Sequence, residues 1–196
     1  YTAPASNGGS VITSYTAVAS PGGQTGTVSQ AGSGTITVTG LTTGTSYTFT
    51  VFATNLAGNG ASSAASNSIT TFSVPGAPTI GTATPTGGTT ATVAYTAPAS
   101  NGGTVITSYT AVSSPGGLTG TLSQAGSGTI TVTGLTSGVS YTFTVFATNS
   151  VGNSAASAAS NSITTFTVPG TPTIGTATAT SATTATVSYT APASDG

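Results

Sequence analysis

A repeat of 94 residues constrains this chain more than any other feature. Tyr1, Tyr95 and Tyr189 each begin the phrase YTAPAS, and residues 1–94 align without a gap with residues 95–188, from which they differ at 16 positions. A unit of this length is too long for a solenoid repeat and fits a small globular domain. The sequence therefore predicts near-identical domains in tandem.

Two proline-rich segments set the expected domain boundaries. They read FSVPGAP at residues 72–78 and FTVPGTP at residues 166–172. Their prolines, which cannot donate to a β-ladder, predict semi-rigid linkers. These prolines are Pro75, Pro78, Pro169 and Pro172. We therefore expect an incomplete domain over residues 1–73, a complete domain over 74–167 and the first two strands of a third domain over 168–196.

The two end pieces are expected to be complementary. Residues 1–73 should lack the first strand of the domain and most of the second, and residues 168–196 should carry those strands. Either the chain is a window from a longer array, or the tail of one chain completes the head of the next by strand complementation. The window is favoured, because the linkers already mark natural domain ends elsewhere.

The complete domain shows short strands with alternating apolar residues. Ala91, Val93 and Tyr95 should share one face of a strand, and Ile130 and Val132 should point inward from another. Seven strands are expected, near residues 78–84, 91–95, 105–112, 118–124, 129–135, 141–149 and 160–166. Strands of this length between Gly-rich turns predict an all-β, two-sheet sandwich.

Two stretches also resemble a known family. They are GLTSGVSYTFTVFATNSVG at residues 134–152 and TVAYTAPASNGGTVITSYT at residues 92–110. With the Pro–Gly–x–Pro linkers, they resemble the fibronectin type III domain, of the kind found in tandem in secreted bacterial enzymes and surface proteins. The resemblance implies a seven-stranded, immunoglobulin-like sandwich that serves as a spacer or binding module, not as a catalyst.

The resemblance further implies a tyrosine corner in each copy, formed by Leu41 with Tyr47 and by Leu135 with Tyr141. In this motif the tyrosine hydroxyl bonds back to the backbone across the sandwich. The chain departs from the family where a core Trp is usual, because Tyr1, Tyr95 and Tyr189 stand there. Tyr fills less volume and needs a partner for its hydroxyl.

The composition excludes several classes of function. The chain has no Lys, Arg, His or Cys, and Asp195 is its only charged side chain. Acid–base, nucleophilic and metal chemistry need those residue types, so we expect no enzyme, no catalytic residue, no cofactor and no metal site. Without Lys and Arg, neither nucleic-acid binding nor polybasic membrane contact is expected. The sequence also has no apolar run long enough to predict membrane insertion.

Two kinds of surface residue are candidates for contacts. Phe52 and Phe146 fall out of phase with the buried positions beside them, so they should point outward as lateral contacts with another domain or chain. The alternative is an isolated exposed aromatic ring. Threonines alternate at residues 35–39 and 129–133. They could form a hydroxyl array for ice or crystalline polysaccharide, but the high β-propensity of Thr explains them more simply.

The absence of charge also bears on function. Edge strands are normally protected by charged side chains, and a net charge near zero promotes association. We therefore expect a self-associating structural spacer of an extracellular or cell-surface filament, sheath or adhesin shaft, with further copies of itself as partner. The alternative is a polysaccharide-binding accessory module of a secreted enzyme, which retention on insoluble glycans would distinguish.

Overall fold

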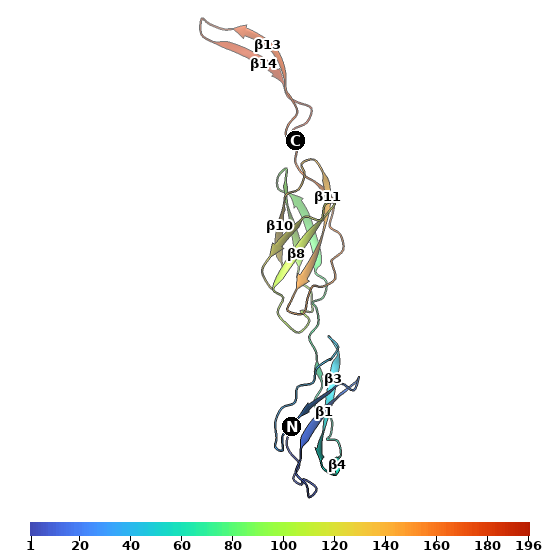
Figure 1. The fold of residues 1–196 in the computed structure, drawn as a ribbon. Coiled ribbons are helices and arrows are strands. Elements are labelled where there is room, and N and C mark those ends of the chain that lie inside the picture. The colour runs from blue at the N-terminus through green and yellow to red at the C-terminus, as the bar shows by residue number, and fades with distance from the viewer. The chain divides into compact units, whose positions relative to one another are not determined.

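A computed structural model describes residues 1–196, and it contains only β-strands, turns and loops. The chain divides into two compact units. The first comprises Tyr1–Val74 and Gly102–Thr104, and the second comprises Pro75–Asn101 and Val105–Gly196 (Figure 1). The chain forms no helix that could cross a membrane. The domain boundaries expected after residues 73 and 167 stay predictions.

The second unit contains a sandwich of two antiparallel sheets. The three-stranded sheet has the order β10 (Gly128–Thr133), β7 (Thr90–Thr96), β6 (Thr79–Pro85). The four-stranded sheet has the order β12 (Ile163–Thr164), β11 (Ser140–Thr148), β8 (Ser108–Ser114), β9 (Thr119–Leu122). These seven strands form the all-β sandwich that the alternating pattern predicts.

The core of this sandwich lies between the inner faces of the two sheets. Val93 on β7 is opposite Ile130 on β10, and Val145 on β11 is opposite Ala111 on β8. Val93, Val145 and Phe143 are 0% exposed. Burying a side chain of this kind contributes about 1.5–3 kcal/mol. The period-two alternation therefore selects the inner face, as expected for β7, β10 and β11.

Several predicted strands are shorter than expected; the strand expected at residues 118–124, for example, forms only over Thr119–Leu122. The strand expected at residues 105–112 begins only at Ser108, and of the strand expected at residues 160–166 only Ile163–Thr164 forms a ladder. The segment before β12 follows β11 through serine side chains instead. The hydroxyls of Ser154, Ser157 and Ser160 accept hydrogen bonds from β11 amides at 2.9–3.0 Å. The backbone N–H groups of the same serines donate to β11 carbonyls at 2.8–2.9 Å, so each serine bonds to β11 in both directions without a regular ladder.

The first unit has the counterpart of the four-stranded sheet only. Its strands are β1 (Ser14–Ser20), β2 (Thr25–Val28), β3 (Ser46–Asn55), β4 (Gly58–Asn59) and β5 (Ile69–Thr70). Residues 35–39 have the sequence TITVT of β10 but form no strand, contrary to expectation. In the second unit this sequence pairs with β7, and the first unit has no counterpart of β6 and β7 to pair with it.

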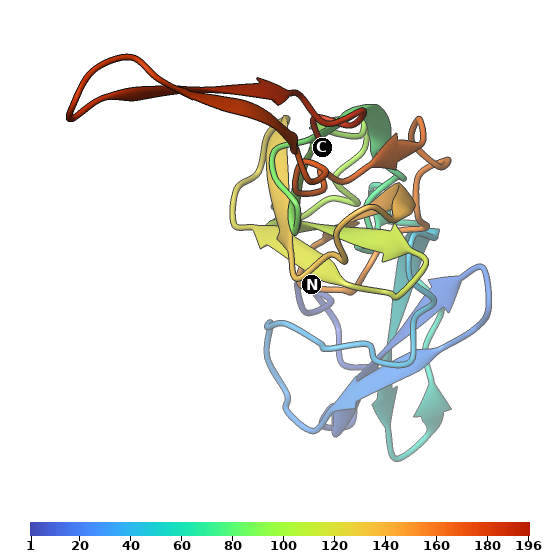
Figure 2. The ribbon, with the colours of Figure 1, turned by 90° about the horizontal axis from the view of Figure 1, so that it is seen from above.

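A hairpin follows the sandwich of the second unit. It consists of β13 (Thr173–Ala179) and β14 (Ala185–Thr190), drawn in dark red in Figure 2. It repeats the pairing of β6 with β7, since Ala177 is opposite Val187 as Ala83 is opposite Val93. Every residue of both strands is exposed, so this hairpin forms without a second sheet.

Candidate functional site: the outer face of the four-stranded sheet

The outward-facing residues of β11, β8 and β9 form an uncharged surface, which we call the outer face. Phe146 lies on it opposite Thr110 of β8. The Thr110 hydroxyl is 2.9 Å from the hydroxyl of Thr121 on β9. Phe146 is half-buried. The outer face therefore presents hydroxyl groups around a phenyl ring that is only partly accessible.

The first unit repeats this arrangement. Phe52 of β3 lies opposite Thr16 of β1, and the Thr16 hydroxyl is 2.9 Å from that of Thr27 on β2. Phe52 is also half-buried. The structure thus places both predicted phenylalanines at equivalent positions on the outer sides of their sheets. Their role as lateral contacts stays a prediction.

The chemistry of the outer face is limited to contact and hydrogen bonding. Threonine hydroxyls can both donate and accept, and an aromatic ring offers an apolar surface with a specific geometry. No three His, Cys, Asp or Glu side chains lie together anywhere in the chain, so no side-chain cluster could hold a metal ion.

Tyr95, which stands where the family usually has Trp, is held by a polar cluster that the sequence did not predict. Its ring centroid is 4.3 Å from that of Tyr109. Its hydroxyl donates to the Gly126 carbonyl at 3.1 Å and accepts from Gln124 Nε2 at 2.9 Å. Burial raises the pKa of Tyr95, and the hydrogen bond from Gln124 offsets only part of this rise. Burial, together with the nearby Tyr95, also raises the pKa of Tyr109. The cluster stabilises the core. The sequence near Tyr95 gives no sign that Gln124 would pair with its hydroxyl.

The tyrosine-corner residues make a local hydrogen bond. The Tyr141 hydroxyl accepts from the backbone N–H of Thr136 at 3.0 Å, and the Tyr47 hydroxyl accepts from that of Thr42 at 2.9 Å. Each bond reaches back five residues along the chain. The expectation of a bond across the sandwich was therefore wrong. The bond from Thr42 lowers the pKa of Tyr47.

The leucines of the two corners differ in burial. Leu135 is 2% exposed, whereas Leu41 is only half-buried. Residues 35–42 and 129–136 are identical in sequence, so the difference comes from the strands that cover the two leucines. Leu135 belongs to the closed core of the second unit, and the first unit has no counterpart of the three-stranded sheet that completes that core.

Each linker glycine makes a backbone hydrogen bond to the loop after the hairpin that follows the linker, which is β6–β7 for the first linker and β13–β14 for the second. The Gly76 N–H donates to the Ser100 carbonyl at 2.9 Å, and the Gly170 N–H donates to the Ser194 carbonyl at 3.0 Å. The four linker prolines do not share one environment. Pro75 and Pro78 are buried, and Pro169 and Pro172 are exposed. Their role as semi-rigid linkers stays a prediction.

The fold defines a class, and comparison with known proteins gives the family. A two-sheet antiparallel sandwich whose sequence is repeated along the chain defines the class of tandem β-sandwich proteins. Residues 1–69 and 76–163 match the family model of the fibronectin type III domain. The chain belongs to the fibronectin type III family, as its motifs indicated.

Similar proteins include two curated enzymes. The chain is 40% identical over 134 residues to Chitinase A1 of Niallia circulans, a match that covers 66% of this chain and 18% of that protein. It is 33% identical over 133 residues to Exoglucanase B of Cellulomonas fimi, which covers 66% of this chain and 12% of that protein. The chain therefore spans less than a fifth of either enzyme.

Among solved structures, the FN1–FN3 domains of chicken CNTN1 are 17% identical, with a TM-score of 0.43, over 79% of this chain and 56% of that one.

The two curated relatives are enzymes by name, and neither is named as a filament or adhesin. The comparisons therefore favour the accessory-module alternative over the filament, sheath or adhesin shaft.

Proposed function

We propose that this chain is a non-catalytic accessory module of a secreted polysaccharide-degrading enzyme, and that its outer faces contact the polysaccharide. The observation that carries the proposal is the similarity of both repeats to parts of Chitinase A1 and Exoglucanase B. The relatives are a chitinase and an exoglucanase by name, and their similarity supports an extracellular location as part of this proposal.

The chemistry of the outer face supports this proposal. Around Phe146 it offers hydroxyl groups that can bond to sugar hydroxyls and a ring that can cover the apolar side of a sugar. The face carries no charge, which suits a neutral polymer. It occurs twice in the chain, around Phe52 and around Phe146, so two weak contacts on one polymer would add through effective concentration.

Retention on insoluble glycans tests the proposal. The full chain is mixed with chitin or with cellulose, and the bound fraction is measured over a range of glycan concentrations. We expect binding that falls about tenfold when Phe52→Ala and Phe146→Ala are combined, since both contact sites lose their ring. Leu56→Ala is the matched control, because Leu56 is 89% exposed and lies outside the strands.

Thermal unfolding of each variant shows whether the half-buried phenylalanines can be removed without loss of the fold. If the wild-type chain is retained on neither glycan, the proposal is wrong. It is equally wrong if the folded double variant binds as well as Leu56→Ala.

A further inference from the structure

Three asparagines of the chain are followed directly by glycine, at residues 7–8, 59–60 and 101–102. An asparagine in this position can react with its own backbone, because the nitrogen of the next residue can attack the side-chain amide carbon. Glycine has no side chain to hinder this approach. The reaction turns a neutral amide into a carboxylate, which matters in a chain whose only charged side chain is Asp195.

The reaction takes place in two steps. In the first, the glycine nitrogen bonds to the asparagine Cγ, the Cγ–Nδ2 bond breaks, and the amide nitrogen leaves as ammonia with the proton of the glycine N–H. In the second, water adds to either carbonyl of the resulting cyclic imide and opens it to aspartate or isoaspartate. An acceptor for the glycine proton and a donor to the asparagine Oδ1, where negative charge develops, should both favour the first step.

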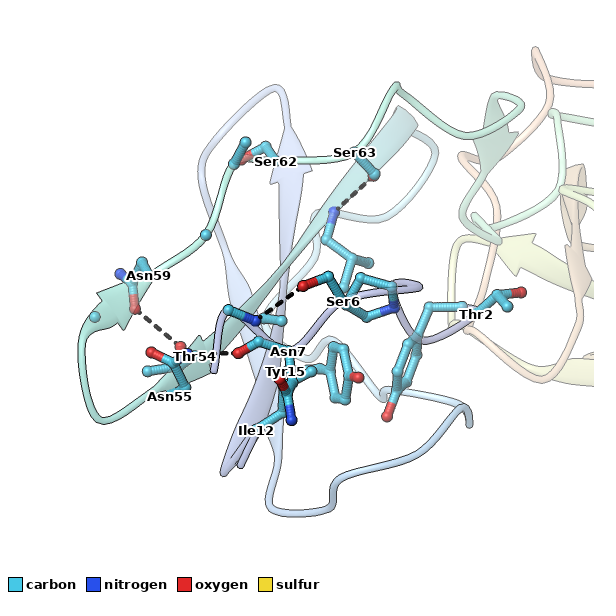
Figure 3. A pocket seen from close by; sticks show the side chains of 18 of the residues that line it. Thr2, Ser6, Asn7, Ile12, Tyr15, Thr54, Asn55, Asn59, Ser62 and Ser63 are labelled. Atoms are coloured by element: carbon cyan, nitrogen blue, oxygen red, sulfur yellow. Dashed lines mark hydrogen bonds between the residues drawn. The ribbon is translucent and has the colours of Figure 1, made fainter. Parts of the chain in front are cut away.

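The loop at residues 6–9 provides both of these groups (Figure 3). The Gly8 N–H donates to Ser6 Oγ at 3.2 Å, and the Gly9 N–H donates to Asn7 Oδ1 at 3.0 Å. The serine hydroxyl can accept a proton and donate its own, and the Gly9 N–H stabilises charge on Oδ1. Asn55 Nδ2 holds the loop by donating to the Asn7 carbonyl at 2.8 Å. Asn7 is therefore held with its side-chain carbonyl polarised and its attacking nitrogen next to a proton acceptor.

Asn59 is followed by the same residue, but its surroundings differ. The Gly60 N–H donates to the backbone carbonyl of Ala53 at 2.8 Å, and Asn59 pairs with Thr54 between β4 and β3. The Thr54 hydroxyl also donates to Asn59 Oδ1 at 2.9 Å (Figure 3). A carbonyl has no proton of its own to pass on, and ring closure would break the backbone bond of Gly60. The hairpin therefore opposes the reaction at Asn59.

The loop at residues 100–103 repeats the first loop. Both loops read SNGG. Asn149 Nδ2 donates to the Asn101 carbonyl at 2.9 Å, as Asn55 does to its counterpart in the first loop. Gly102 has a φ of 74°, and the equivalent Gly8 has a φ of 69°. The same sequence in the same conformation should have the same reactivity.

We propose that Asn7 and Asn101 are sites of spontaneous deamidation and that the β3–β4 hairpin protects Asn59 from it. Reaction at both sites changes the formal net charge of the chain from −1 to −3. The reaction needs only the chain and water, so it does not depend on the proposed contact with a glycan.

The third copy of the loop shows that the product fits. Asp195 stands at the position of Asn7. The Gly196 N–H donates to Ser194 Oγ at 3.3 Å, which is the equivalent of the glycine-to-serine bond of the first loop. A carboxylate at this position is therefore compatible with the conformation of the loop.

Incubation of the full chain at mildly alkaline pH tests the proposal, because alkali deprotonates more of the glycine amide. Isoelectric focusing counts the added charges. A protease that cuts after Tyr and Phe separates the three sites into residues 2–15, 53–72 and 96–109, in which mass spectrometry locates the product. In the folded chain we expect Asn7 and Asn101 to convert at least about tenfold faster than Asn59. In denaturant the three sites should convert at similar rates, because only the shared Asn–Gly sequence then remains.

Ser6→Ala removes the proton acceptor from the first loop alone. We expect Asn7 to convert about tenfold more slowly in this variant, since one hydrogen bond that favours the first step is lost. Asn101 in the same chain is the internal control and should keep its wild-type rate. Because Ser6 is exposed, thermal unfolding should match that of the wild type.

Three results overturn the proposal. They are a folded chain that gains no charge while the denatured chain does, an Asn59 that converts as fast as Asn7 in the folded chain, and a Ser6→Ala chain in which Asn7 converts at its wild-type rate.

Discussion

The tyrosines of this chain show how one residue type depends on its surroundings. The Tyr95 hydroxyl is paired inside the core, the Tyr141 hydroxyl closes a loop, and Tyr189 is 74% exposed. The sequence predicted that Tyr141 would bond to backbone and that Tyr95 would need a partner. It could not predict Gln124 as that partner, because Gln124 is 29 residues away along the chain and meets Tyr95 only when β7 and the loop after β9 come together.

The Tyr141 hydroxyl provides a test at the residue scale. Tyr141→Phe keeps the ring but removes the acceptor of the Thr136 N–H, so we expect the free energy of unfolding of the second unit to fall by about 1–2 kcal/mol. Denaturant unfolding measures this change. Tyr189→Phe removes a hydroxyl that is exposed to water, and it should leave stability unchanged. Equal effects of the two variants would contradict the role given to the Tyr141 hydrogen bond.

At the scale of the element, identical sequences form different structures. TITVT is strand β10 at residues 129–133 but forms no strand at residues 35–39. The alternation of apolar residues predicted β7, β10 and β11 together with their inner faces. In a strand that is covered on one side, every second side chain is buried. The alternation did not predict the serine contacts before β12, because those side chains satisfy backbone groups of another strand.

The outer face was likewise predicted only in part: Phe146 was placed by its phase, but its pairing with Thr110 comes from the register of β8 and β11.

The two hydrogen bonds between Asn161 and Ala83, which we call the asparagine clasp, give a matched pair of variants. Asn161→Ala removes both bonds to Ala83 of β6, so we expect the second unit to lose about 1–3 kcal/mol of stability and the Ala83 amide to exchange faster. Asn67→Ala changes the counterpart, whose Nδ2 donates to the Ser68 carbonyl at 3.5 Å. It should change stability by less than about 0.5 kcal/mol. Hydrogen exchange and thermal unfolding compare the two; comparable losses in both variants would show that the clasp does not hold β6.

At the scale of the whole molecule, ionisation is almost confined to tyrosine. Burial is the main cause that raises the pKa of Tyr15, Tyr95 and Tyr109 above the ordinary value of 10.0, and a hydrogen bond lowers the pKa of Tyr47. A group with a raised pKa keeps its proton longer in the folded state than in the unfolded state. The stability that it contributes is therefore present below its unfolded pKa and is lost as the pH rises through its folded pKa.

We accordingly expect a thermal midpoint that is nearly constant from about pH 5 to pH 9 and falls above about pH 10. Tyr47, whose pKa is lowered, acts in the opposite direction and reduces this fall. Thermal unfolding at a series of pH values measures the midpoint, and tyrosinate absorbance follows the ionisation. A marked loss of stability between pH 6 and pH 8 would show that some other group controls folding, since no Lys, His or Cys is present.

The sequence by itself determined the repeat, the all-β class, the inward-facing residues of the main strands and the absence of charge. These depend on local patterns: a period of 94 residues, alternation every two residues, and residue types that are present or missing. Only the tertiary structure decided which copy of an identical residue is buried. Ile130 is 1% exposed and its counterpart Ile36 is half-buried, because burial depends on the strands that arrive from elsewhere in the chain, and β7 covers only one of the two.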